Sequence, residues 1–82
     1  MMPVYRPHVV QALAAHGLAP KPHTSPRVLR DAVNDLYRHE IRRLRDRCRA
    51  GEIPVPELAS HVVTLRTRYL LLSTPLTLWT LD

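Results

Sequence analysis

The sequence has little of several residue types, and each shortage excludes a class of protein. Among its 82 residues there is no phenylalanine, and there are only one tryptophan, one cysteine and two glycines. The single cysteine, Cys48, cannot form an intrachain disulfide, which argues against a small secreted domain held together by disulfides. Two glycines leave no glycine-rich loop that would bring backbone amides close to a nucleotide phosphate.

Long hydrophobic runs are also missing. No apolar stretch approaches the roughly 20 residues needed to cross a bilayer, so we expect no membrane association. The first residues lack the charged region and the continuous apolar region of a secretory signal. Together with the unpaired cysteine, these features predict a cytoplasmic protein.

Basic residues outnumber acidic ones by 12 to 7, which gives a formal net charge of +5 and a pI near 10.4. Such a balance favours acidic partners, nucleic acid among them, but the placement of the charge must decide. Lys21 is the only lysine. This preference for arginine, with abundant alanine, leucine and proline, is typical of proteins encoded by GC-rich bacterial genomes, and we therefore expect a bacterial origin.

Prolines and glycines divide the chain into three predicted helices. The first spans about residues 7–16, between Pro7 and a left-handed cap at Gly17. The second spans about 26–50, because Ser25 and Pro26 form a strong start signal and no breaker occurs before Gly51.

A third predicted helix spans about residues 56–72 and must stop before Pro75. The short connector that precedes it forces the second and third helices into an antiparallel hairpin. An apolar tail follows from residue 75 and is expected to pack down, with a further helical turn slightly favoured over an extended segment. The sequence therefore predicts an all-α, three-helix, single domain over residues 1–82.

Apolar residues recur at helical spacing on both long helices. The connector sets the register of the hairpin and is expected to place Leu44 near Val62. Other pairs expected from the same register are Cys48 with Leu58, Ile41 with Leu65, and Tyr37 with Tyr69.

The apolar arc of the third helix is wider than one neighbour can cover. Ala59, Val63 and Leu70 lie beside its main stripe, and Trp79 adds a large apolar side chain in the tail. A contiguous exposed apolar patch is uncommon on a soluble monomer and usually marks an interface. These four residues are therefore candidates for a protein interface, most simply in a two-fold homodimer. The alternative is that the tail folds over Val63 and Leu70 and leaves nothing to share.

Four arginines form a ridge along the second helix at spacings of four, three and four residues. Such a ridge is able to follow a phosphate backbone, which would make the chain a weak, largely sequence-independent nucleic-acid-binding protein. The plainer interpretation is a solvated helix face, and Asp46 dilutes its charge. The long proline-rich connector before this helix does not suit a helix-turn-helix motif. The ridge consists of Arg38, Arg42, Arg45 and Arg49.

Glu40 lies within the apolar stripe of the second helix, so we expect it to be largely buried and paired. The hairpin register brings Arg66 and Tyr69 near it, and Arg43 follows on its own helix. Buried charges are usually paired, and one carboxylate alone performs no recognisable reaction. Glu40, Arg66 and Tyr69 are therefore predicted to form a structural polar cluster rather than a catalytic one.

The remaining reactive residues do not form a recognisable centre. Of the five histidines, His61 follows Glu57 at a ligand-like spacing, but no third ligand is identifiable, so no metal site is predicted. Cys48 falls on the core face, where a reactive thiolate is not expected. We therefore predict no enzyme, no metal and no cofactor. The leading hypothesis is a structural or protein-interaction module that self-associates or docks on a protein partner, with nucleic-acid binding as the alternative.

Overall fold

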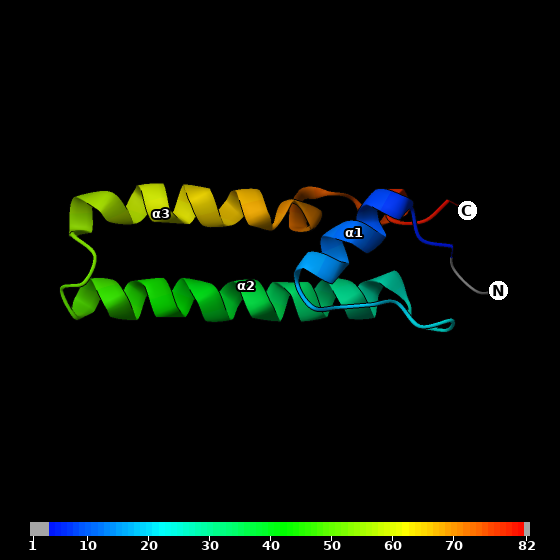
Figure 1. The fold of residues 1–82 in the computed structure, drawn as a ribbon, viewed down its shortest axis with the longest axis horizontal. Helices are drawn as coiled ribbons and strands as arrows, with labels where there is room; N and C mark the ends of the chain where they lie inside the picture. The colour runs from blue at the N-terminus through cyan, green and yellow to red at the C-terminus, as the bar shows by residue number, and fades with distance from the viewer. Residues whose placement is uncertain (1–3, 82) are drawn as a thin grey trace.

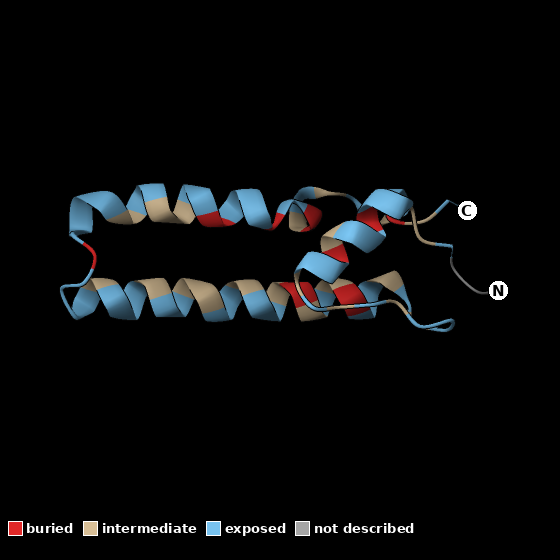
Figure 2. Ribbon diagram, viewed as in Figure 1, coloured by how far each residue is buried: buried red, intermediate tan, exposed pale blue. Residues whose placement is uncertain are grey.

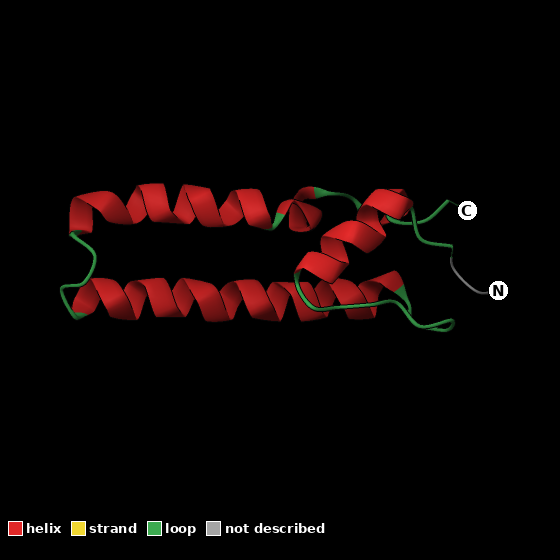
Figure 3. Ribbon diagram, in the orientation of Figure 1, coloured by secondary structure: helices red, strands yellow, loops and turns green. Residues whose placement is uncertain are grey.

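The computed structural model describes residues 4–81, and it is helical with loops between the helices (Figure 3). Three α-helices are present, α1 (Pro7–Ala15), α2 (Pro26–Arg49) and α3 (Val55–Arg68). Two short 3-10 helices follow, η1 (Leu70–Ser73) and η2 (Leu76–Leu78). Within the described residues the sole β-type pairing is an isolated bridge between Tyr5 and Thr80. The predicted all-α class with three helices is confirmed.

Local backbone chemistry sets most helix ends. All three helices carry proline within their first two positions, where the missing N–H costs nothing. At the start of α2, the Ser25 side chain accepts a hydrogen bond from the Val28 amide at 3.4 Å. Gly17 and Gly51 follow α1 and α2 with φ of +77° and +79°, the left-handed conformation that glycine adopts without strain.

The end of α3 differs from the sequence prediction. The α-helix ends at Arg68 rather than near residue 72, because Tyr69 leaves the helical conformation with φ of −117° and ψ of 37°. The chain then continues as η1, a tighter 3-10 turn. The tail adds one further short helical turn of the same kind, η2.

The molecule is an elongated hairpin with an added short helix. α2 and α3 lie side by side and run in opposite directions, while α1 crosses the hairpin at the end where α2 begins (Figure 1). The dimensions are 50 × 16 × 16 Å. No helix within residues 4–81 combines the length and the apolarity that crossing a membrane requires.

The core lies at the end of the hairpin that α1 covers (Figure 2). We call the other end of the hairpin, residues 41–64, the arm. Its inward side chains on α2 and α3 are only half-buried, and the connector between the two helices holds the buried Ile53. One core cluster holds the buried residues Val9, Leu13, Leu29, Val33, Leu65, Tyr69, Leu71 and Trp79.

The prediction that Trp79 belongs to an exposed interface is wrong. Its side chain has no exposed surface, and its indole N–H donates to the Thr74 carbonyl at 3.1 Å. The tail instead pairs with the start of the chain, through a hydrogen bond from the Arg6 amide to the Trp79 carbonyl at 3.0 Å. Because the tail packs against the start of the chain, it does not cover Val63 and Leu70, which have 58% and 64% of their surface exposed.

Candidate functional site

A hydrogen bond links the two long helices at Glu40. The Tyr69 hydroxyl donates to Glu40 Oε2, which makes this pair the part of the predicted polar cluster that forms. The Tyr69 ring stacks on His16 with ring centroids 4.3 Å apart and meets the edge of Tyr37 at 5.2 Å. The phenol is therefore fixed between α1, α2 and the end of α3.

Tyr69 is held in its protonated form. Burial raises the pKa of its phenol to about 12, and the hydrogen bond and negative charge of Glu40 act in the same direction, partly opposed by the positive charge of Arg68. At neutral pH this phenol donates a hydrogen bond and is not a nucleophile or a base.

Two expectations for the polar cluster were wrong. Glu40 is half-buried rather than largely buried, because its side chain borders the open groove between α2 and α3. Arg66 is exposed and forms no ion pair with Glu40 within the described residues. It lies on the opposite side of the hairpin, among the residues around the exposed Val63 and Leu70.

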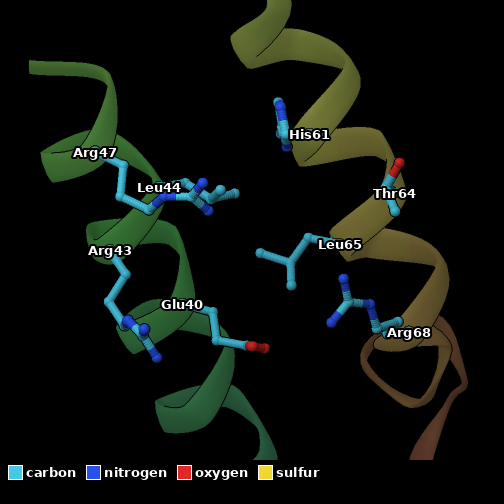
Figure 4. A pocket seen from close by; sticks show the side chains of 8 residues that line it. All are labelled: Glu40, Arg43, Leu44, Arg47, His61, Thr64, Leu65 and Arg68. Atoms are coloured by element: carbon cyan, nitrogen blue, oxygen red, sulfur yellow. The ribbon is translucent and has the colours of Figure 1, made fainter. Parts of the chain in front are cut away.

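A polar groove runs between α2 and α3 on the Glu40 side of the hairpin (Figure 4). It has a volume of about 220 Å³. Figure 4 shows the Glu40 side chain extending from α2 toward α3, while the Arg68 side chain extends back toward α2. The groove is lined by Glu40, Arg43, Leu44, Arg47, His61, Thr64, Leu65 and Arg68.

The groove continues into a second hollow of about 490 Å³. Both cavities share Glu40, Arg43 and Arg68, so they meet at these three residues. The second hollow reaches α1 and is more apolar than the first, since Ala15, Leu36 and the Tyr69 ring form part of its wall. His16 and His39 complete its lining.

The other side of the hairpin is apolar at its surface. A hollow of about 330 Å³ lies there, and Val63 and Leu70 form part of its wall together with Tyr37 and Leu72. Ala59 is exposed one helical turn before Val63. We call Ala59 and Val63 of α3, together with Leu70 of η1, the α3 strip. Arg66 lies within it, because it lines the same hollow as Val63 and Leu70.

The predicted arginine ridge lies on neither of these surfaces. Its four members are all exposed on α2. At about 100° per residue, they point roughly 150° away around the helix from Arg43 and Arg47. The arginines in the second half of α2 therefore form two separate sets, one facing solvent and one at the groove.

The grouping of the groove arginines is not predicted from the sequence. The predicted role of Arg43 is limited to a pairing with Glu40, and Arg47 and Arg68 have no predicted role. The available signal was spacing, since residues 43 and 47 share one side of α2, and residues 61, 64 and 68 share one side of α3. Recognising the groove also requires knowing how the two helices are rotated relative to each other.

Other chemistry-bearing residues do not gather into a centre. Within residues 4–81, no three side chains of His, Cys, Asp or Glu are placed to hold a metal ion. Cys48 is half-buried on the inward side of the hairpin. Comparisons with protein-family models, with curated proteins and with solved structures found no match for this chain.

Proposed function

We propose that the chain is a protein-interaction module that self-associates through the α3 strip. The observation that carries this proposal is the exposure of Val63 on α3 and Leu70 on η1, at 58% and 64%, beside the apolar hollow that both side chains line. Burying apolar surface is the main driving force for association between helices.

Helix lengths support the need for a further partner. α2 has 24 residues and is about 36 Å long, while α1 has 9 residues and is about 14 Å long. α1 therefore covers less than half of the hairpin. Over the remaining length, α2 and α3 have only each other, and a two-helix contact leaves inward residues such as Leu44 and Val62 half-buried.

A second copy is the occupant that we favour. Each copy has the same uncovered arm, so a two-fold pairing satisfies both with a single surface. An antiparallel pairing of two α3 strips would centre between Val63 and Arg66 and bring Ala59 of one copy opposite Leu70 of the other. The aliphatic stem of Arg66 is able to lie along such a contact while its guanidinium reaches water.

Sedimentation equilibrium at micromolar concentration tests the proposal. We expect twice the monomer mass of 9.4 kDa, reduced to the monomer mass by Val63→Glu and by Leu70→Glu. Val28→Glu is the matched control, since Val28 is 59% exposed but lies on the first turn of α2, away from the strip. A monomer mass at all concentrations would refute self-association, as would equal dissociation by the control variant.

Nucleic-acid binding is the second candidate, and the exposure of the ridge favours it. Arg38, Arg42, Arg45 and Arg49 are all exposed, and none of them takes part in an ion pair within residues 4–81. Each single-strand phosphate that such a ridge neutralises contributes about −0.7 to the slope of log affinity against log salt concentration.

Fluorescence anisotropy with a mixed-sequence single-stranded RNA tests the second candidate. The double variant Arg42→Gln/Arg45→Gln should bind more weakly than the wild type and flatten the salt slope by about 1.4. Lys21→Gln/Arg27→Gln removes the same charge from two other exposed positions and serves as the control. Equal effects of the two double variants would mean that net charge, not the ridge, holds the RNA. Self-association through the α3 strip should not weaken as salt is added, which separates the two candidates.

A further inference from the structure

The groove on the Glu40 side gathers positive charge from both long helices. α2 contributes Arg43 and Arg47, and α3 contributes Arg68. Among the described residues, the single ion pair within 4.0 Å joins Arg47 Nε to Glu52 Oε2 at 3.5 Å, and it is well exposed to solvent. The guanidinium groups of Arg43 and Arg68 therefore remain available to an external anion.

The groove lining is positively charged, which suits an anion. Three guanidinium groups stand against the Glu40 carboxylate in the lining and against Glu52, which pairs with Arg47. The Glu40 carboxylate is already engaged as the acceptor of the Tyr69 hydroxyl. Arginine presents a planar fork of N–H donors that fits the oxygens of a phosphate group, and the Thr64 hydroxyl and the His61 ring add polar groups to the wall.

The size and continuation of the groove restrict the ligand further. A volume of about 220 Å³ is below the range of pockets that take drug-sized molecules, so it suits a single phosphate group with water. The adjoining hollow, with Ala15, Leu36 and the Tyr69 ring in its wall, offers an apolar and aromatic surface to a group attached to that phosphate.

We propose that this groove binds a phosphate monoester, with its dianionic phosphate between Arg43 and Arg68 and its organic group in the hollow beside Tyr69. A phosphodiester carries only one negative charge, so the two guanidinium groups attract it less strongly than they attract a dianion. This site lies on the opposite side of the hairpin from the α3 strip, so it is independent of self-association. It is also distinct from the ridge, whose arginines point the other way around α2.

Nuclear magnetic resonance titration of the isotope-labelled full chain tests the proposal in buffer of constant ionic strength. The arginine side-chain N–H signals and the His61 signals are followed while phenyl phosphate, methyl phosphate or dimethyl phosphate is added. We expect phenyl phosphate to bind more tightly than methyl phosphate, and dimethyl phosphate to bind at least tenfold more weakly than phenyl phosphate. Parallel titrations with adenosine 5′-monophosphate and O-phosphotyrosine then distinguish a nucleotide source from a phosphorylated side chain.

Three variants separate the groove from general charge effects. Arg68→Gln should weaken phenyl phosphate binding about tenfold, the loss of one charge-assisted hydrogen bond. Arg45→Gln removes the same charge from the ridge and should leave the affinity within about twofold. Glu40→Gln keeps an acceptor for the Tyr69 hydroxyl but removes the repelling charge, so it should tighten binding about threefold.

The direction of the Glu40→Gln effect is the sharpest criterion, because a variant that merely disturbs the fold weakens binding. Weaker binding to Glu40→Gln would overturn the proposal. Equal losses in Arg68→Gln and Arg45→Gln would also overturn it, since the anion would then be responding to net charge. If dimethyl phosphate binds as tightly as phenyl phosphate, the groove is not a site for monoesters. If phenyl phosphate binds no more tightly than methyl phosphate, the organic group does not occupy the hollow.

Discussion

Replacement of Trp79 by alanine should remove a large part of the stability of this chain. Trp79 has no exposed surface and belongs to the same core cluster as Val9, Leu13 and Leu71. Truncating a buried tryptophan to alanine typically costs about 3 to 5 kcal/mol, the sum of lost burial and a residual cavity. A chain of 82 residues has a free energy of unfolding of about 4 to 12 kcal/mol at the usual value per residue. The variant should therefore keep about −1 to 9 kcal/mol and lose at least about a quarter of the stability of the wild type.

Urea denaturation followed by circular dichroism at 222 nm measures this loss without needing tryptophan fluorescence. With a slope near 1 kcal/mol per molar urea, the midpoint should fall by roughly 3 M or more. Trp79→Phe should remain folded and lose about 1 to 2 kcal/mol, because it keeps a ring but lacks the N–H that reaches the Thr74 carbonyl. Leu78→Ala is the control at the neighbouring position, where the side chain is 49% exposed, and should change stability by no more than about 0.5 kcal/mol. Equal losses in Trp79→Ala and Leu78→Ala would refute the placement of the indole in the core.

Three further predictions concern single contacts. Tyr69→Phe removes the hydrogen bond to Glu40 and should lower the free energy of unfolding by about 1 to 2 kcal/mol in urea, whereas Glu40→Gln should lower it less, because the amide oxygen still accepts. The wild type should lose stability as the pH rises from about 10 to 12, because the pKa of Tyr69 is about 12 in the folded state and about 10 in the unfolded state, so the folded state holds the phenol proton more tightly. If Tyr69→Phe loses as much stability over the same pH range, the loss comes from other groups. Gly51→Ala forces a side chain into a φ of +79° and should cost about 1 kcal/mol in urea, while Gly51→Asn, which tolerates that conformation better, should cost less; equal values would mean that the turn relaxes.

The ends of the first two helices followed directly from sequence because they depend on local backbone chemistry. Proline at a helix start and glycine in the left-handed conformation act within a few residues, wherever the chain later packs. The end of α3 did not follow in the same way. Residues 70–72 are leucines that suit a continued helix, and the α-helix ends where Tyr69 packs between His16 and Tyr37. Those contacts come from α1 and α2 and are not visible in local sequence.

The candidate site was predicted in part for the same reason. Helical periodicity and the short connector were enough to place Tyr69 beside Glu40, and the hydrogen bond between them is present. Helical periodicity predicts the direction in which a side chain points but not how far neighbouring elements bury it, so the predicted burial of Glu40 is too high. Trp79 was misplaced because nothing local indicates that the tail pairs with the start of the chain. Arg68 lies in the same groove as Arg43 and Arg47 because of how the two helices are rotated relative to each other, and the sequence of one helix alone does not specify this rotation.

The position of the core at one end of α2 divides this helix into two zones of different local stability. Leu29 and Val33 in its first half belong to the core cluster, whereas no residue in its second half is buried. Amide protons in the first half should exchange with solvent only when the whole chain unfolds. Those near Cys48 are expected to exchange by separation of the arm alone, at a lower free energy. A single continuous helix would thus belong to two cooperative units, and pairing of the arms between copies would merge them into one.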